Sequence, residues 1–258
     1  MKEIAVKAAL QGGKVLMKFF SEKFSVISKS ERDIVTTVDT ESERTILKVL
    51  QKSFPKHNFV SEEIGKIDNG SDYTWIIDPL DGTVNFAAHN PLFAISIALK
   101  KKKEIALSVI YLPIFDEMFV AEKSRGAILN NKPISVSSKN ELKKAISSVS
   151  PGIKTEEKVQ AMKKIIGAVM PKSRSILVLG STPTMLAFVA CGRVDNYITY
   201  KSDVYNMAAG YLLIKEAGGK VTDFKNNEFN IDSEKLNVIA SNGFLHKEIM
   251  PIINKLNL

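Results

Sequence analysis

The chain has 258 residues, which is long enough for one large domain or for two domains that share a core. Hydrophobic residues make up 45% of it and charged residues 25%, as in ordinary soluble globular proteins, and no apolar run reaches the roughly 18 residues that a membrane span needs. The net charge of +8 is dispersed along the chain rather than gathered in one arm. We therefore expect a small anionic ligand rather than a nucleic acid or a membrane.

The N-terminal segment carries charged and polar side chains at regular intervals, which predicts an amphipathic helix over residues 2–20 rather than a signal peptide. The single cysteine, Cys191, lies in an apolar helical run, and we interpret it as a packed core thiol. A lone cysteine without an export signal is typical of the reducing cytoplasm, where we expect this protein to work.

A second helix is predicted within "TTVDTESERTILKVLQKSF", after a strand-like start. Thr40 and Glu43 have the spacing of a capping box, which places Asp39 at the start of this helix. Apolar side chains then recur on one helical face, and Pro55 follows the predicted end.

Strands dominate the next part of the chain. Apolar patterns predict strands over residues 73–78, 93–99, 105–112 and 117–122, with a lysine-rich hairpin turn at residues 100–103. Asn130 and Asn131 mark a further turn within residues 126–136. An antiparallel meander preceded by two helices predicts an α+β arrangement for this first part.

After residue 144 the pattern alternates between strands and helices, which is typical of an α/β arrangement. The predicted strands cover residues 145–150, 175–181, 195–200, 220–224 and 236–241. The predicted helices cover residues 156–170, 182–192 and 204–219, with a last helix from about residue 244. Ser, Lys and Asn accumulate at residues 136–144, so we predict an N-terminal domain of residues 1–140 and a C-terminal domain of residues 141–258.

The segment "WIIDPLDGTVNF" runs from an apolar strand directly into a charged cluster. Asp78 and Asp81 lie three residues apart at the predicted end of the strand, where Pro79 restricts the backbone and Gly82 permits a tight turn. Thr83 begins a short helical segment, whose first N–H groups would form an anion site beside the two carboxylates.

Two further acids precede this segment, Glu62 in "NFVSEEIG" and Asp39. Oxygen ligands of this kind suit Mg²⁺, with a substrate phosphate completing its coordination. A metal-activated water, deprotonated by a neighbouring residue, could then attack the phosphorus. Either acid alone is more often a turn cap or an exposed charge, and the compact cluster at residues 78–83 is what favours a metal site.

Five segments, in order along almost the whole chain, resemble motifs of the inositol monophosphatase family. The segment "WIIDPLDGTVNF" resembles its first signature, "VSEEIG" its glutamate motif and "DIVTTVDTESE" its N-terminal acidic segment. The segments "GSTPTMLAFVACGRVDNYI" and "NMAAGYLLIKEAGG" resemble its two C-terminal motifs. The resemblance implies an αβαβα layered sandwich, and a Mg²⁺-dependent, often lithium-sensitive phosphomonoesterase that acts on a small phosphorylated metabolite and forms a homodimer.

The resemblance also implies a role for each matching residue. The implied ligands, for two or three Mg²⁺ ions per site, are Glu62, Asp78, the Leu80 carbonyl, Asp81 and Asn206. The residues implied to orient and activate the attacking water are Asp39, Glu62 and Thr83. The residues implied to bind the substrate are Asp81, Gly82, Thr83, Gly180, Ser181 and Thr199. The metal site would thus lie in the N-terminal domain, and the C-terminal domain would complete the substrate pocket.

Two positions depart from the family pattern. Asn206 stands where the second signature normally has an aspartate, and the lost charge corresponds to a gross Coulomb term on the order of several kcal/mol at an effective dielectric of about 20. Asp203 is an alternative ligand, although we interpret it as the N-cap of the following helix. Thr199 stands where inositol-selective members have a glutamate, which favours broader use of sugar phosphates.

The favoured hypothesis is therefore the hydrolysis of inositol 1-phosphate, fructose 1,6-bisphosphate or similar compounds. One alternative keeps the chemistry and changes the substrate to 3′-phosphoadenosine nucleotides or NADP. Another alternative is a degenerate member that binds a phosphorylated ligand or RNA machinery without turnover. Asn206 and the net charge motivate this last hypothesis, whereas the intact acidic cluster argues against it.

Overall fold

A computed structural model describes residues 1–21, 26–30, 33–150, 155–233 and 235–258, with the backbone alone for residues 26–30 and 33–36. The helices are α1 Lys2–Phe20, α2 Thr37–Ser53, α3 Thr83–Ala87, α4 Glu156–Val169, α5 Thr182–Ala190, α6 Val204–Glu216 and α7 His246–Asn254, with 3₁₀ helices at Leu142–Lys144 and Met170–Lys172. The strands are β1 Val26–Ser30, β2 Asp33–Thr36, β3 Asn58–Ser61, β4 Gly65–Ile67, β5 Tyr73–Asp81, β6 Ala94–Lys101, β7 Glu104–Leu112, β8 Glu117–Glu122, β9 Ala127–Leu129, β10 Lys132–Pro133, β11 Ile146–Ser150, β12 Ser175–Leu177, β13 Asn196–Ser202, β14 Lys220–Thr222 and β15 Leu236–Ser241.

Two sheets organise the molecule, beside the small β1–β2 hairpin. The larger sheet has the order β10-β9-β8-β7-β6-β5-β3-β4 and is antiparallel except for the β3–β5 pair. The smaller sheet has the order β12-β11-β13-β15-β14, with β11 parallel to both of its neighbours. The predicted lysine turn joins β6 to β7, and Asn130–Asn131 joins β9 to β10 with positive φ at both residues, as a tight hairpin turn requires.

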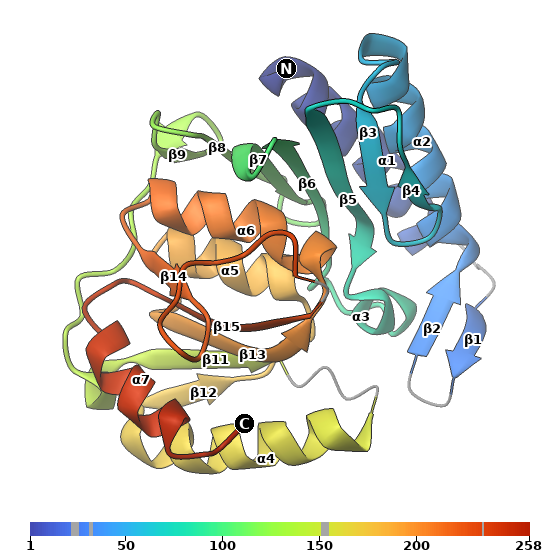
Figure 1. The fold of residues 1–258 in the computed structure, drawn as a ribbon. Helices are drawn as coiled ribbons and strands as arrows, with labels where there is room; N and C mark the ends of the chain where they lie inside the picture. Colours follow the sequence, from blue (N-terminus) through green and yellow to red (C-terminus); the bar gives the residue numbers. More distant parts are fainter. Residues whose placement is uncertain (22–25, 31–32, 151–154, 234) are drawn as a thin grey trace.

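The helices lie in three layers around these sheets (Figure 1). Helices α1 and α2 pack on the outer face of the larger sheet, α5 and α6 lie between the two sheets, and α4 and α7 cover the outer face of the smaller sheet. The αβαβα arrangement is therefore confirmed. The two predicted halves share the central helical layer, and the division at residue 140 stays a prediction.

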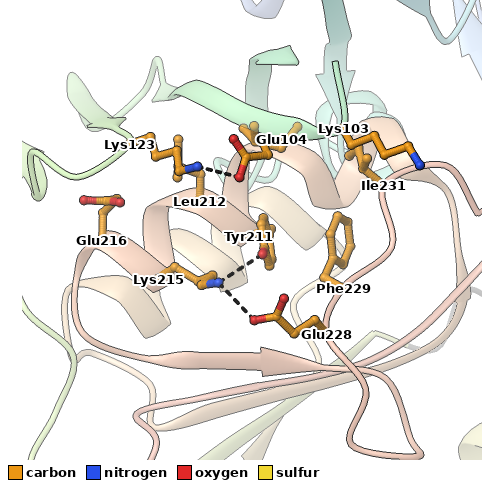
Figure 2. Close-up of a pocket in the computed structure, with 11 residues that line it drawn as sticks. Lys103, Glu104, Lys123, Tyr211, Leu212, Lys215, Glu216, Glu228, Phe229 and Ile231 are labelled. Atoms are coloured by element: carbon orange, nitrogen blue, oxygen red, sulfur yellow. Dashed lines mark hydrogen bonds and ion pairs between the residues drawn. The ribbon is translucent and has the colours of Figure 1, made fainter. Parts of the chain in front are cut away.

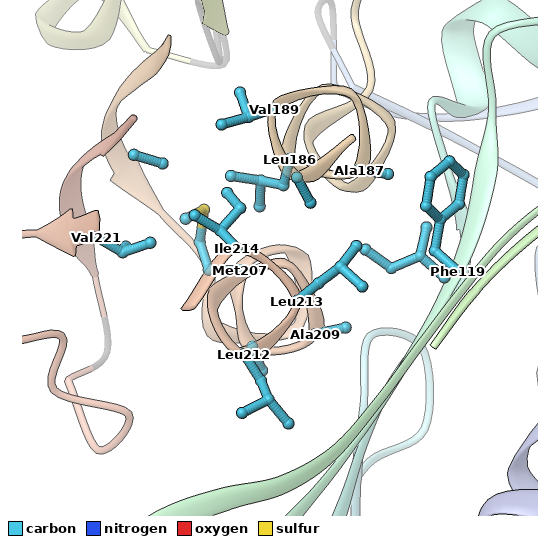
Figure 3. Packing of buried hydrophobic residues seen from close by; sticks show 14 of the residues in the cluster. Phe119, Leu186, Ala187, Val189, Met207, Ala209, Leu212, Leu213, Ile214 and Val221 are labelled. Atoms are coloured by element: carbon cyan, nitrogen blue, oxygen red, sulfur yellow. The ribbon is translucent and has the colours of Figure 1, made fainter. Parts of the chain in front are cut away.

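The central core is built around the contact between α5 and α6. Figure 3 shows apolar side chains of both helices directed toward one another, with Phe119 of the larger sheet and Val221 of the smaller sheet at its edges. A Cβ atom at Gly210 would lie 2.2 Å from Leu186 Cδ1, so this glycine permits the close approach of the two helices. Cys191, at the C-terminus of α5, packs against this core, and its burial raises the pKa of the thiol.

Two local predictions were wrong in their details. Helix α2 begins at Thr37 rather than at the predicted capping box, because the Glu43 carboxylate is fully buried and accepts hydrogen bonds from the backbone N–H groups of Glu63 and Ile64 instead. Strand β5 continues through Asp81 instead of ending at Asp78.

The N-cap prediction at the start of α6 is confirmed in position. Asp203 occupies the N-cap position, as predicted, but its side chain makes no capping hydrogen bond. Its carboxylate, which the sequence offered as an alternative metal ligand, forms an ion pair with Lys235 instead.

Candidate active site

The site is built where β5 deforms. Asp78 pairs with Ser96 of β6, whereas Asp81 pairs with Ala94, so three residues of β5 span the distance that two residues of β6 cover. Such a bulge is expected beside Pro79, which has no N–H group to donate to the ladder. The bulge brings both aspartates to one end of the strand, and Gly82 then turns the chain with φ of 89° into α3.

Asp78 is the most deeply buried acid of the group, with 1% of its surface exposed. Its burial raises the pKa of this carboxyl well above the usual range, and the negative charges of Glu62, Asp81 and Asp39 raise it further. The Leu80 N–H group donates to Asp78 Oδ1 at 3.1 Å and offsets part of this effect. The structure thus places the other three acids that the sequence singled out within electrostatic reach of Asp78.

Thr83 connects two parts of this group. Its hydroxyl lies 3.1 Å from Asp39 Oδ1 and 3.1 Å from the Leu80 carbonyl oxygen, and it donates to either. Asp39 is 3% exposed in the first turn of α2, so a helix from the outer layer reaches the turn after β5. The predicted pair of Asp39 and Thr83 is therefore in direct contact.

Asn206 lies in the first turn of α6, in the central helical layer. This turn approaches the acidic corner, the name used here for the group Asp39, Glu62, Asp78 and Asp81. Ser96, the ladder partner of Asp78, donates to the Tyr205 carbonyl oxygen at 3.4 Å, which holds the first turn of α6 against β6. Asn206 Oδ1 and Asp78 Oδ2 are both buried without a hydrogen-bond partner among the described residues. A buried oxygen without a partner is costly, so each of these two oxygens is a candidate ligand for a cation.

The donor set fits Mg²⁺, which prefers carboxylate, carbonyl and amide oxygens. Within the described ranges, no three or more Asp, Glu, His or Cys side chains are already gathered into a metal cage. Two facts account for this. Carboxylates repel one another when no cation lies between them. In addition, two of the predicted ligands are not acids, namely the Leu80 carbonyl and the Asn206 amide.

The predicted substrate-binding residues of the second half lie around the start of α5. Gly180 is exposed with φ of 73°, whereas Ser181 is 1% exposed and its hydroxyl pairs with that of Thr184 at 2.7 Å. Thr199 is 3% exposed. We therefore find Gly180 open to a ligand and the Ser181 and Thr199 side chains largely covered, and their substrate contacts stay predictions.

Tyr197 ties this region to the acids. Its hydroxyl lies 2.8 Å from Thr182 Oγ1 and also hydrogen-bonds with the side chains of Ser150 and Thr199. Burial raises the pKa of the Tyr197 hydroxyl to about 12, and the charge of Asp81 contributes to this rise. A neutral network of hydroxyl groups thus lies within electrostatic reach of the acidic corner.

One residue that the sequence reasoning missed joins the two halves at the site. Asn85 Nδ2 donates to the Leu92 carbonyl oxygen at 2.7 Å and to the Leu179 carbonyl oxygen at 2.8 Å. It thereby fastens the turn after β5 to the segment that precedes Gly180. Its place within the first signature was the available signal, but no local pattern indicates a partner 94 residues away.

A separate pocket of about 200 Å³ lies at the opposite end of α6 (Figure 2). Two of its lysines are paired, Lys123 with Glu104 at 2.6 Å and Lys215 with Glu228 at 3.6 Å. Tyr211 stacks on Phe229 in its wall, with ring centroids 4.4 Å apart. This pocket contains none of the predicted site residues, and we place the candidate active site at the acidic corner.

The chain is similar to known proteins over nearly its whole length. The model of the inositol monophosphatase family matches residues 1–258. A fructose-1,6-bisphosphatase/inositol-1-monophosphatase of Thermotoga maritima is 36% identical, with 98% of this chain and 95% of the relative covered. The Nus factor SuhB of Haemophilus influenzae is 36% identical, with 97% and 94% covered. The crystal structure of the extragenic suppressor protein suhB from Bartonella henselae has a TM-score of 0.92 at 32% identity and covers 98% of both chains.

Proposed function

The chain belongs to the inositol monophosphatase family and is a phosphoric monoester hydrolase, and from this premise we propose that it is a Mg²⁺-dependent phosphatase of small sugar or inositol phosphates. One observation carries the proposal above the others: the Asp78 carboxylate is buried within electrostatic reach of three further acids, and one of its oxygens has no hydrogen-bond partner in the described part of the chain. Such a group is stable at neutral pH when a divalent cation neutralises it.

The residues that would hold Mg²⁺ are Glu62, Asp78, Asp81, the Leu80 carbonyl and Asn206. Bound Mg²⁺ would supply Lewis-acid stabilisation of charge on the phosphoryl oxygens. The partner-free Asn206 oxygen supports its assignment as a ligand in place of the family's aspartate, because an amide oxygen can bind Mg²⁺ without contributing a negative charge. We propose two ions per site, with a third held more weakly near Glu62.

Asp39 and Thr83 would handle the proton of the attacking water. When the Thr83 hydroxyl donates to Asp39 Oδ1, its lone pairs are available to accept a hydrogen bond from a water molecule. Water held in this way has its oxygen lone pair free to attack the phosphorus, while its proton moves toward the buried carboxylate. The Gly82 and Thr83 N–H groups would receive the phosphoryl oxygens at the turn.

One residue bears on the substrate class. Thr199 stands where inositol-selective members have a glutamate, and its hydroxyl is bound to that of Tyr197 in a neutral, largely buried network. The relative from Thermotoga maritima carries both activities in its name, fructose-1,6-bisphosphatase and inositol-1-monophosphatase. We therefore propose that this chain accepts both kinds of substrate, and nucleotide 3′-phosphates or NADP less well.

A second candidate function rests on a different observation. A relative named Nus factor SuhB matches 97% of this chain, and Asn206 departs from the family's acidic ligand. A binding role in transcription machinery, with or without phosphatase activity, is thus the alternative. Among the described residues no helix is both long and apolar enough to cross a membrane. The single free cysteine supports our proposal of a cytoplasmic location, and family resemblance supports that of a homodimer.

A phosphate-release assay tests the proposal. The purified chain is incubated with inositol 1-phosphate, fructose 1,6-bisphosphate, 3′-phosphoadenosine 5′-phosphate and NADP across a range of Mg²⁺ concentrations. We expect release from the first two, dependence on Mg²⁺, and a loss of at least about 100-fold in Asp81→Asn. Absence of release from every substrate at high Mg²⁺ would favour the binding role, and normal turnover by Asp81→Asn would contradict the site assignment.

A further inference from the structure

Helix α2 has an unusual inward face. Asp39, Ser42 and Glu43 lie on one side of it, at the spacing of three and four residues that brings side chains together on a helix. Ser42 and Glu43 have no exposed surface, and Asp39 has 3%. Burying two carboxylates is expensive unless each is held by specific donors, so a single helix face with both requires an explanation beyond amphipathic packing.

Each of these side chains binds a different segment of the acidic site. Ser42 Oγ donates to the Pro79 carbonyl oxygen at 2.9 Å, between the two aspartates of β5. Asp39 accepts from the Thr83 hydroxyl. Helix α2 therefore contacts the bulge of β5 through Ser42 and the turn after it through Asp39.

Glu43 binds the third segment, which follows Glu62. Its Oε1 atom accepts from the Glu63 N–H group at 3.1 Å and from the Ile64 N–H group at 3.2 Å. Two donors that converge on one carboxylate oxygen fix the turn at the end of β3. Glu62 directly precedes these two residues, and its side chain lies close enough to Asp78 to raise the pKa of that carboxyl. The turn therefore determines where the Glu62 carboxylate is placed.

We propose that Glu43 is a positioning residue: by binding the two N–H groups after Glu62, it sets the distance between the Glu62 carboxylate and the acids of β5. The proposal rests on the proposed function in that the positioned group would bind Mg²⁺. Glu43 touches neither the substrate nor the metal in this assignment and acts through Glu62. Residues that orient metal ligands in this way typically contribute 10–100-fold to metal affinity, about the effect we expect.

The test uses three substitutions of Glu43 and a matched control. Glu43→Gln keeps an acceptor oxygen of the same reach, Glu43→Asp keeps the charge but shortens the side chain, and Glu43→Met removes the acceptor. The control is Glu216→Met, because the Glu216 carboxylate also accepts from backbone N–H groups, those of Ser124, Arg125 and Gly126 at 2.8 to 3.1 Å, in a hairpin outside the acidic site.

Two readouts are independent of turnover. Amide hydrogen exchange in Mg²⁺-free buffer reports whether the turn after Glu62 is held, and calorimetric titration with Mg²⁺ alone reports metal affinity. We expect Glu43→Met to accelerate exchange at Glu63 and Ile64 and to weaken Mg²⁺ binding by about 10–100-fold. Glu43→Gln should recover most of both effects and Glu43→Asp only part, whereas Glu216→Met should leave Mg²⁺ affinity unchanged.

A double-substitution cycle separates positioning from general stability. If Glu43 acts through Glu62, its replacement has little further effect on Mg²⁺ affinity in a Glu62→Gln background. Equal losses in both backgrounds, or unchanged exchange at Glu63 and Ile64, would overturn the proposal. Should Glu43→Met fail to fold, the comparison of Glu43→Gln with Glu43→Asp decides, and equal Mg²⁺ affinities in these two would also overturn it. If the wild type bound no Mg²⁺, the proposed function would fall, and the exchange data alone would decide whether Glu43 holds the turn.

Discussion

Replacement of Asn85 by alanine tests how the two halves of the site are held together. Asn85 Nδ2 makes hydrogen bonds of 2.7 Å and 2.8 Å to the Leu92 and Leu179 carbonyl oxygens. A typical hydrogen bond contributes about 1 kcal/mol net, so we expect Asn85→Ala to lower the free energy of unfolding by about 2 kcal/mol. For a chain of this size that corresponds to roughly 4–8 °C in the melting temperature.

The substitution should also affect substrate binding. Leu179 precedes Gly180, where a Cβ atom would lie 3.1 Å from Asn85 Nδ2, so the asparagine supports the shape of this segment directly. We expect KM to rise more than kcat falls, because the acids on β5 do not depend on Asn85. Thermal unfolding followed by circular dichroism and steady-state phosphate release measure the two effects.

Asn90→Ala is the matched control. The Asn90 side chain is exposed and makes two longer hydrogen bonds, each of 3.3 Å, to Asn85 Oδ1 and from the Leu92 N–H group. Substitutions at such surface positions usually change stability by less than about 0.5 kcal/mol. The reasoning would be refuted if Asn85→Ala destabilised the protein no more than Asn90→Ala, or if KM stayed unchanged.

Four further predictions concern single positions. Gly82→Ala should lower the free energy of unfolding by at least about 1–2 kcal/mol, measured by urea denaturation, because φ is 89° there and a Cβ atom would lie 2.9 Å from a backbone oxygen. Asp78→Asn should stabilise the Mg²⁺-free protein at neutral pH and abolish stabilisation by Mg²⁺. Because the pKa of Asp78 is raised in the folded state, its carboxyl destabilises the fold increasingly as the pH rises above the usual pKa of an aspartate. Denaturation in chelator from acidic to neutral pH checks this sign. Asn206→Asp should lower the Mg²⁺ concentration for half-maximal rate, and an unchanged requirement would show that Asn206 does not limit the metal site. Burial lowers the pKa of His246 to about 4, so its contribution to stability is complete above its usual pKa of 6.5 and is lost as the pH falls toward 4. His246→Asn should remove this loss, which amounts to up to about 3 kcal/mol. A wild-type pH profile of stability in the variant would contradict the prediction.

Much of the fold was predictable because its signals are local. The helix over residues 2–20 and the hairpins at the lysine turn and at Asn130–Asn131 follow from periodicity and turn chemistry over a few neighbouring residues. The errors arose where a distant contact overrode a local preference. Glu43 has the spacing of a capping box, yet its carboxylate binds the turn after Glu62, which is some 20 residues away.

The acidic site shows the same division between local and distant information. The sequence by itself indicated the proposed chemistry, because Asp78, Asp81 and Gly82 are close neighbours whose residue types already favour a cation beside a tight turn. Only the tertiary structure decided which other groups meet them. Ser96 of β6 binds the first turn of α6, which carries Asn206, and Asn85 binds Leu179 across 94 residues. These meetings depend on how helices and sheets pack, and packing is determined by the summed burial of many side chains rather than by any short run of residues.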